Sequence, residues 1–272
     1  MEGAPEAVSD ATVRVRQLRK DFFDEARGEV HAVDGLDFEC HRGEVFGLLG
    51  ANGAGKTTTL RILSTVIRPT AGSASVMGHD VLEEPEAVRR SLGFYSASTA
   101  LYPRLTGRET LQFFARVNRY PEPQVAARVD ELVHRFGIGE YQDTRVEKLS
   151  SGMKQKVSMA RTVAHDPPVL IFDEPTVGLD VMNALEMVRV VRELRDEGKT
   201  ILFSSHIMSE VEKLCDRIGI IHRGRLLALG TLEDLRQETG KHYLEDVFVH
   251  YVTDAEGEGA VLGPMGAIRK DG

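Results

Sequence analysis

The sequence has few cysteines and no long apolar run, and each of these absences excludes a class of protein. Its 272 residues include no tryptophan and only two cysteines, Cys40 and Cys215, which lie far apart without a CxxC pair. This spacing argues against a disulfide framework and a structural zinc site, and it fits a reducing compartment. No segment approaches the roughly 18 consecutive apolar residues that a membrane-spanning helix requires. If the chain works at a membrane, we expect another chain to provide the spans.

The charge balance is acidic, because 34 Lys and Arg residues face 42 Asp and Glu residues, for a net charge of −8. A general nucleic-acid binder would show a basic footprint, so we expect no nucleic-acid partner. Residues 1–10 lack the basic region and apolar stretch of a signal peptide, which predicts a cytoplasmic protein. The 42% hydrophobic and 28% charged residues are ordinary for a globular chain of this length.

Short apolar segments alternate with amphipathic ones, which predicts an α/β fold with a mostly parallel sheet. The expected strands are 12–18, 30–39, 44–49, 169–172, 200–204, 217–221 and 225–229. The expected helices are 56–68, ended by Pro69, and 106–118, 123–136, 153–164, 183–197 and 209–215. Residues 240–272 carry a weaker pattern and are expected to form a small appendage or a partly mobile tail.

Residues 50–57 read GANGAGKT and match GxxxxGK[ST], between an expected buried strand and an expected helix. Glycines let the backbone curl so that successive N–H groups point at one anion, and the following helix aims its positive end at the same place. A flexible turn with a chance lysine would not explain this context. The expected nucleotide-binding residues are Gly50, Ala51, Asn52, Gly53, Ala54, Gly55, Lys56, Thr57 and Thr58, with Lys56 on the phosphates and Thr57 on Mg²⁺.

A second expected strand, 169–172, ends in Asp173 and Glu174. Beside a phosphate-binding loop, Asp173 is expected at the Mg²⁺ site and Glu174 next to the attacking water, where hydrolysis needs a proton acceptor. In isolation, the same segment could equally be a strand followed by a solvated acidic turn.

Together these motifs resemble the ATP-binding subunits of ABC transporters, and the resemblance covers residues 12–236. Residues 149–153, LSSGM, resemble the family signature LSGGQ, although Ser151 and Met153 depart from it. The resemblance implies that Ser150 and Gly152 meet the γ-phosphate bound by a second protomer. In isolation, this serine would be interpreted as a helix cap.

The resemblance assigns three further residues. Asp180, in Gly-Leu-Asp, resembles the D-loop at the dimer interface, and His206 resembles the switch histidine that contacts the γ-phosphate. Phe22 stands where the family places an aromatic ring against adenine. The adjacent Phe23 could take that role, and a core or surface phenylalanine is the alternative.

A further departure from the family affects the contact with the membrane subunit. A Gln that contacts Mg²⁺ and links the nucleotide to the membrane subunit usually follows the strand at 92–95, and here Ala97 stands in its place. Either a hydroxyl from Ser96, Ser98 or Thr99 replaces the contact, or the loop signals through packing of Tyr95, Leu101 and Tyr102 against a membrane helix. We favour packing, because two tyrosines and a leucine offer a large amphipathic area. Residues 92–105 and 164–168 look closest to the sodium-extrusion branch of the ABC-2 exporters.

The resemblance thus implies a P-loop NTPase fold with an N-terminal antiparallel β portion and a helical subdomain at about 97–162. Residues 1–238 would form the ATP-binding domain, and 239–272 a small C-terminal extension or a partly disordered tail. With ATP and Mg²⁺, two such chains would close head to tail, as a homodimer, on the cytoplasmic face of a membrane and power export through a separate ABC-2 type permease.

Two alternatives stay open. One is an ABC-type ATPase without a transport role, such as a translation or DNA-repair factor, although those relatives usually carry two nucleotide domains or a long coiled coil. The other is a regulatory binder that hardly hydrolyses ATP, which Glu174 and His206 argue against. The membrane chain would select the substrate, so the sequence leaves the substrate open.

Overall fold

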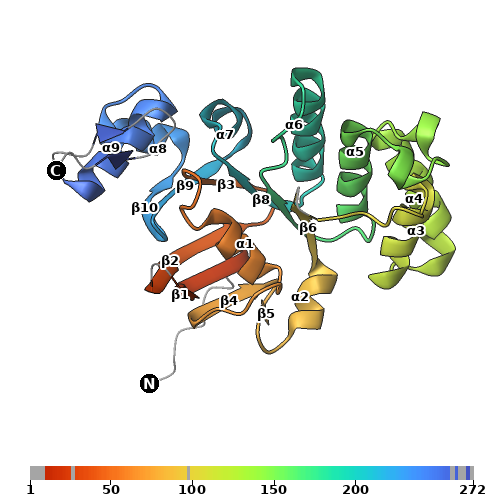
Figure 1. Cartoon of the computed structure of the whole chain (residues 1–272), viewed down its shortest axis with the longest axis horizontal. Helices are drawn as coiled ribbons and strands as arrows, with labels where there is room; N and C mark the ends of the chain where they lie inside the picture. Colours follow the sequence, from red (N-terminus) through yellow and green to blue (C-terminus); the bar gives the residue numbers. More distant parts are fainter. Residues whose placement is uncertain (1–9, 26–27, 97–98, 258–260, 263–267, 270–272) are drawn as a thin grey trace.

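The computed structural model describes residues 10–25, 28–96, 99–257, 261–262 and 268–269. Its centre is a six-stranded sheet in the order β10-β9-β3-β8-β7-β6 (Figure 1). The strands are β3 (Val45–Leu49), β6 (Leu92–Ser96), β7 (Val169–Asp173), β8 (Thr200–Ser205), β9 (Arg217–His222) and β10 (Arg225–Gly230). Neighbours pair in parallel from β9 to β6, and β10 alone is antiparallel. The predicted α/β fold with a mostly parallel core sheet is confirmed.

The central strands are buried along their whole length, because helices or the second sheet cover both faces. Every residue of β3, β7 and β8 is buried, which explains why these segments are continuous apolar runs. Such runs end at the sheet's carboxyl edge, where polar residues can face a ligand.

A second, antiparallel sheet has the order β2-β1-β4-β5, from β1 (Ala11–Asp24), β2 (Gly28–His41), β4 (Ala71–Val76) and β5 (His79–Asp80). The predicted strands 12–18 and 30–39 were too short, because the hairpin continues past Leu18 through largely polar residues. There, backbone pairing and ion pairs such as Arg19–Asp34 (3.0 Å) hold the strands without an apolar alternation. The antiparallel pattern fits the predicted N-terminal β portion.

Three helices form a group at one end of the molecule: α3 (Gly107–Val117), α4 (Val125–Arg135) and α5 (Ser151–Thr162) (Figure 1). Short 3₁₀ turns at Glu122–Gln124, Gly139–Tyr141 and Val146–Lys148 connect them. The start of α3 is fixed by a capping box, in which the Thr106 side chain accepts from the Glu109 N–H and Glu109 accepts from the Thr106 N–H.

The remaining helices flank the sheets: α1 (Lys56–Leu63), α2 (Pro85–Ser91), α6 (Val181–Asp196), α7 (Met208–Leu214), α8 (Leu232–Thr239) and α9 (Leu244–Glu256). The prediction that the helix from Lys56 runs to Pro69 was wrong. It ends at Leu63, since the Ser64 hydroxyl bonds back to the Leu60 carbonyl and Thr65 adopts a φ of 60°. Among the described residues, no helix combines the length and apolarity needed to cross a bilayer.

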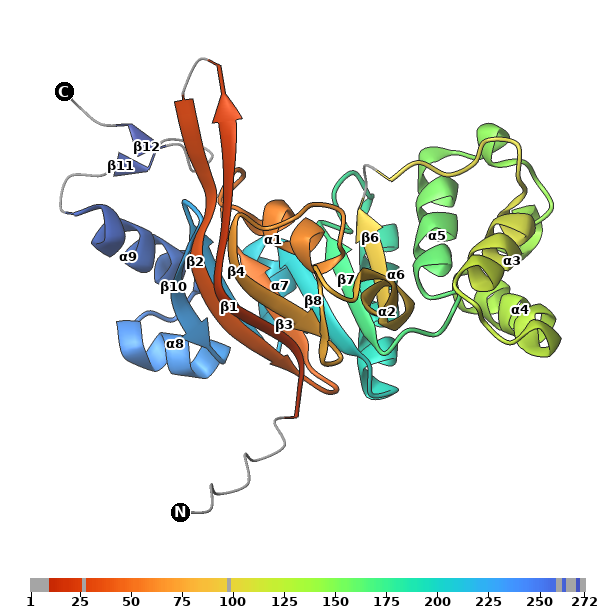
Figure 2. The ribbon, with the colours of Figure 1, turned by 90° about the horizontal axis from the view of Figure 1, so that it is seen from below.

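The segment 239–272, expected to be weakly structured, contains α9. Leu244, Val247, Phe248 and Val252 are buried on this helix, in one apolar cluster with residues of α7, α8 and β9. Figure 2 shows α9 beside β10, at the end of the molecule away from α3 and α4. Two short strands follow, β11 (Val261–Leu262) and β12 (Ile268–Arg269).

His165, between α5 and β7, makes the stability of this fold sensitive to acid. Both its ring nitrogens are buried without a hydrogen-bond partner of normal geometry in the described part of the chain, and burial lowers the pKa of His165 to about 4. The unfolded histidine titrates near 6.5, so the unfolded state binds the proton more readily as pH falls below 6.5. Between pH 8 and pH 5 we expect this residue alone to remove about 2 kcal/mol of stability.

Urea unfolding at pH 8 and pH 5 measures this effect, with His165→Leu as the variant that removes the titrating ring. The variant is expected to lose less stability on acidification than the wild type. An identical loss in both proteins would show that other groups carry the pH dependence.

Candidate functional site

The loop between β3 and α1, residues 50–55, curls tightly against its neighbours. At two of its positions the neighbouring backbone leaves no room for a side chain, so only glycine fits there. A Cβ on Gly50 would lie 2.4 Å from the Ile221 carbonyl oxygen, and one on Gly55 would lie 2.4 Å from that of Ala32. Gly55 also has a φ of 107°, which other residues rarely adopt. A cavity of about 380 Å³ opens in front of the loop, lined by Phe22, Ala32, residues 52–58 and Glu174.

Lys56 is the cation of this cavity. Its ammonium donates to the carbonyl oxygens of Gly50 (2.6 Å) and Ala51 (3.1 Å), and it lies 3.4 Å from the Glu174 carboxylate. The side chain is 4% exposed, and burial lowers the pKa of Lys56 while the nearby Glu174 opposes that shift. An anion in the cavity would therefore meet a poorly hydrated positive charge at close range.

Asp173 and Thr57 approach each other although 116 positions separate them. The Asp173 carboxylate is buried and accepts from the Thr57 hydroxyl (3.1 Å) and the Ser204 hydroxyl (2.8 Å). Parallel pairing of β7 with β8 places Asp173 opposite Ser204. A carboxylate and a hydroxyl are hard oxygen donors, which is the set that suits Mg²⁺.

Glu174 follows with a φ of 48°, a conformation that costs a non-glycine residue energy. Its N–H lies near the Ser204 carbonyl (3.2 Å) and hydroxyl (3.1 Å) oxygens, which hold it in place. One Glu174 carboxylate oxygen then lies 3.2 Å from the His206 Nδ1 and 3.4 Å from the Lys56 ammonium. The structure thus brings a carboxylate, an imidazole and an ammonium together at the edge of the cavity.

Two supporting residues had not been predicted. Ser204 could have been found as a polar residue that ends a buried strand beside Asp173. Glu210, on α7, accepts from the Thr176 hydroxyl (2.8 Å) and the Ser205 hydroxyl (3.1 Å), so it ties the loop after Glu174 to the loop of His206. The position of Glu210 relative to the recognised motifs does not predict this role.

The structure does not bring Ser150, Gly152 and Asp180 to the cavity of Lys56. Ser150 caps α5 by accepting from the Met153 N–H (3.3 Å), and Asp180 caps α6 by accepting from the Asn183 N–H (3.0 Å). A Cβ on Gly152 would lie 3.8 Å from the Asn183 amide, so the starts of α5 and α6 are neighbours.

Comparisons with known proteins decide the family. The family model described as "ABC transporter" matches residues 33–177. The ABC transporter ATP-binding protein NatA of Bacillus subtilis (strain 168) is 40% identical over 228 residues, covering 84% of this chain and 93% of NatA. The chain belongs to the ABC transporter family.

Two further similarities agree with this assignment. The daunorubicin/doxorubicin resistance ATP-binding protein DrrA of Streptomyces peucetius is 37% identical over 241 residues, covering 88% of this chain and 73% of DrrA. A solved ATP-binding subunit of an ABC transporter is 30% identical with a TM-score of 0.81, covering 89% of this chain and all of its own. A dimeric ATP-binding cassette, MJ0796 bound to ADP and Pi, shares the fold at 22% identity and a TM-score of 0.74, covering 81% of this chain and 98% of its own. This ABC protein is an ATP-binding subunit with ATPase activity, and the predicted P-loop NTPase fold is confirmed.

Of the two phenylalanines of this ABC ATPase that could meet adenine, only Phe22 lines the cavity. Phe22 is 44% exposed, and the Lys20 ammonium lies 5.0 Å from the centre of its ring. Phe23 is 82% exposed and is not among the lining residues.

A second cavity of about 450 Å³ lies between β6 and α5 of the ABC ATPase, lined among others by Tyr95, Leu101, Gln155 and Ser158. Ala97 and Ser98, which sequence reasoning singled out here, lie outside the described residues. Tyr95 was expected to offer exposed contact area, and this was wrong. It is 2% exposed, because its ring packs against Phe172 with centroids 6.2 Å apart.

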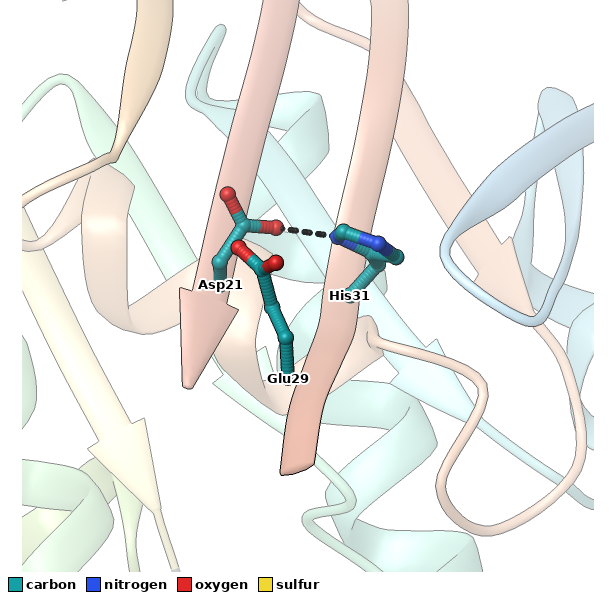
Figure 3. A group of neighbouring side chains, drawn as sticks. All are labelled: Asp21, Glu29 and His31. Atoms are coloured by element: carbon teal, nitrogen blue, oxygen red, sulfur yellow. Dashed lines mark hydrogen bonds and ion pairs between the residues drawn. The ribbon is translucent and has the colours of Figure 1, made fainter. Parts of the chain in front are cut away.

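One group on the β1–β2 hairpin has the residue types of a metal site, with Asp21, Glu29 and His31 facing one another (Figure 3). Their ligand atoms lie within 4.8 Å of each other. The His31 Nδ1 lies 2.7 Å from the Asp21 carboxylate, and this hydrogen bond raises the pKa of His31. Since Asp21 and His31 satisfy each other and Glu29 and His31 are exposed, we assign no metal to the group.

Proposed function

We propose that this chain binds Mg²⁺–ATP at the loop 50–57 and hydrolyses it to energise export through a separate membrane-spanning permease of the ABC-2 type. The observation that supports the chemistry is the convergence of Glu174 with Lys56 and His206, beside the Asp173–Thr57 pair. The resistance proteins among its relatives support export as the direction. The substrate class stays open.

Each residue of the site has a role in this proposal. Lys56 exchanges its contacts with the Gly50 and Ala51 carbonyls for the β- and γ-phosphates, guided by the N–H groups of residues 50–58. Thr57 and Asp173 hold Mg²⁺, which when bound neutralises charge on the phosphates. Phe22 stacks on the adenine.

Glu174 accepts the proton of the attacking water in this scheme, and His206 orients Glu174 and contacts the γ-phosphate. The carboxylate suits this task because Ser204 fixes its backbone and it is only partly buried. A regulatory binder that hardly hydrolyses ATP would not need this convergence.

The remaining predicted residues act across a dimer. Ser150 and Gly152 at the start of α5, with Asp180 at the start of α6, meet the nucleotide held by a second copy of the chain. The start of a helix concentrates unpaired N–H groups and favours an anion. Two copies therefore close head to tail around two ATP molecules, on the cytoplasmic face of the membrane.

In this proposal residues 1–238 form the ATP-binding domain, residues 97–162 form its helical subdomain, and residues 239–272 form an extension.

Replacing Lys56 by alanine tests the nucleotide site. Lys56→Ala removes a buried charge that faces several phosphate oxygens, so we expect ATP to bind about 100-fold more weakly. Equilibrium titration with a fluorescent ATP analogue measures the affinity. Lys213→Ala, at an exposed lysine of α7, is the control. Unchanged affinity in Lys56→Ala would show that ATP binds elsewhere.

The permease docks, in this proposal, at the mouth of the second cavity. Tyr102 stands between the lining residues Leu101 and Pro103 and is 53% exposed, and its ring packs edge-on against Phe113 with centroids 5.4 Å apart. Phe113 and Val117 of α3 are also exposed, which gives an apolar surface next to the cavity. A membrane subunit's helix with apolar and aromatic side chains fits this surface.

Tyr102→Ala tests the docking surface. We expect transport per ATP to fall when the permease is present, while the ATPase rate of the isolated subunit stays nearly intact. Tyr243→Ala, which removes a 62% exposed ring far away at the start of α9, is the control. Full coupling in Tyr102→Ala would contradict the assignment of this surface.

A further inference from the structure

The turn between β9 and β10 lies directly against the phosphate-binding loop. The Gly224 N–H donates to the Ala54 carbonyl (2.9 Å), and the Gly224 carbonyl accepts from the Asp34 N–H (2.8 Å). A Cβ on Gly55 would lie 3.4 Å from the Gly224 Cα. The backbone of the loop is thus confined between β2 and this turn.

The turn itself has a demanding geometry. Arg223 and Gly224 both have positive φ, at 47° and 79°, which is the pattern of a two-residue type I′ hairpin turn. Glycine adopts such angles freely, but arginine does so only at an energetic cost. Pairing of β9 with β10 favours this turn, and a contact that stabilises this conformation of Arg223 stabilises it further.

The carboxylate that contacts the turn comes from the last residue of α9. Glu256 lies 2.7 Å from the Arg223 guanidinium and 2.8 Å from the His222 Nε2. Its side chain is 7% exposed and that of His222 is 14% exposed, so the contact with His222 is shielded from water, whereas the Arg223 side chain is 64% exposed. Shielded charge-assisted hydrogen bonds are stronger than exposed ones.

The apolar face of α9 holds the helix in place independently of Glu256. Leu244, Val247 and Phe248 are buried in one cluster with Val211 of α7 and Leu235 of α8. The helix is therefore a stable platform, and Glu256 is the group by which its end contacts the turn.

We propose that Glu256 is a positioning residue for nucleotide binding: by binding His222 and Arg223 it fixes the turn whose Gly224 N–H holds the Ala54 carbonyl of the phosphate-binding loop. This inference rests on the proposed role of the loop 50–57 and extends the site to the C-terminal helix. Any partner that moves the end of α9 would then change the affinity for ATP.

Glu256→Gln tests the proposal in the full chain. The amide keeps the shape but loses the charge, so the turn and loop sample more conformations and the KM for ATP should rise about fivefold. At saturating ATP the kcat should stay near the wild-type value, because Glu174 and His206 are untouched. Asp254→Asn, at an exposed acid two positions earlier, should change neither parameter.

A rescue separates positioning from a general structural role. Glycine at position 223 favours the turn without help from Glu256, so Glu256→Gln combined with Arg223→Gly should return the KM towards the wild-type value. Loss of α9 packing would not be repaired in this way. A wild-type KM in Glu256→Gln, or a raised KM that Arg223→Gly leaves unchanged, would overturn the proposal.

Titration of Lys56→Ala and Glu256→Gln with the same fluorescent ATP analogue separates this inference from the proposed function. If Lys56→Ala loses ATP binding while Glu256→Gln does not, the nucleotide site stands and the positioning role fails. If Lys56→Ala binds ATP normally, the assignment of the loop fails first.

Discussion

Glu174→Gln is expected to lower the kcat for ATP hydrolysis by a factor of about 100 or more, the usual contribution of a positioned general base. Glutamine keeps the size and the hydrogen bonds of the carboxylate but cannot accept the proton of the attacking water. Lys56, Thr57 and Asp173 stay in place, so ATP should still bind. Phosphate release under saturating ATP measures the rate.

The same variant should accumulate as a dimer with ATP, because closure proceeds and hydrolysis no longer opens it. Size-exclusion chromatography with light scattering, with ATP and with ADP, follows this species. Glu84→Gln, at an exposed acid that pairs only with His79 in the described structure, controls for the loss of one charge. Nearly wild-type turnover in Glu174→Gln would remove Glu174 from its proposed role.

The parts of the fold that the sequence predicts are those in which burial is one-sided or complete. The apolar runs before Gly50 and Asp173 gave correct strands, because a strand buried on both faces contains few polar residues. The segment 71–76, AGSASV, has no such run. It forms β4 because β1 supplies its partner, from Val13 opposite Val76 to Arg19 opposite Ala71. Pairing with a distant strand leaves little trace in the segment itself.

The candidate site likewise contains residues that the sequence predicts and residues that it does not. The glycines, Lys56 and the acidic pair stand in short patterns whose spacing carries the chemistry, so their positions could be predicted. Ser204 and Glu210 act only because β7 lies beside β8 and α7 lies behind the loop of Thr176. The contacts of Glu256 were even less predictable, because its partners His222 and Arg223 are more than thirty positions away in the sequence. Contacts that depend on tertiary packing cannot be inferred from local spacing.

The dimer model makes the second prediction with a large effect. Each complete site takes Lys56 from one chain and Ser150 from the other, so Lys56→Ala and Ser150→Ala should each be nearly inactive alone. In an equal mixture, half of the dimers are mixed, and each mixed dimer has one complete site of two. The mixture should therefore recover up to about a quarter of the wild-type rate if the sites act independently.

Loss of the α5 cap needs its own control, because Ser150→Ala also removes the hydrogen bond to the Met153 N–H. A lost cap costs about 1 kcal/mol of stability. Thr106→Ala removes the corresponding cap of α3, in the same group of helices, and should leave hydrolysis nearly unchanged.

The dimer model also predicts that the wild-type rate of hydrolysis per chain rises with protein concentration until all chains are in dimers. Mixtures no more active than their parents, or a monomer with full activity at every concentration, would show that one chain carries the whole site.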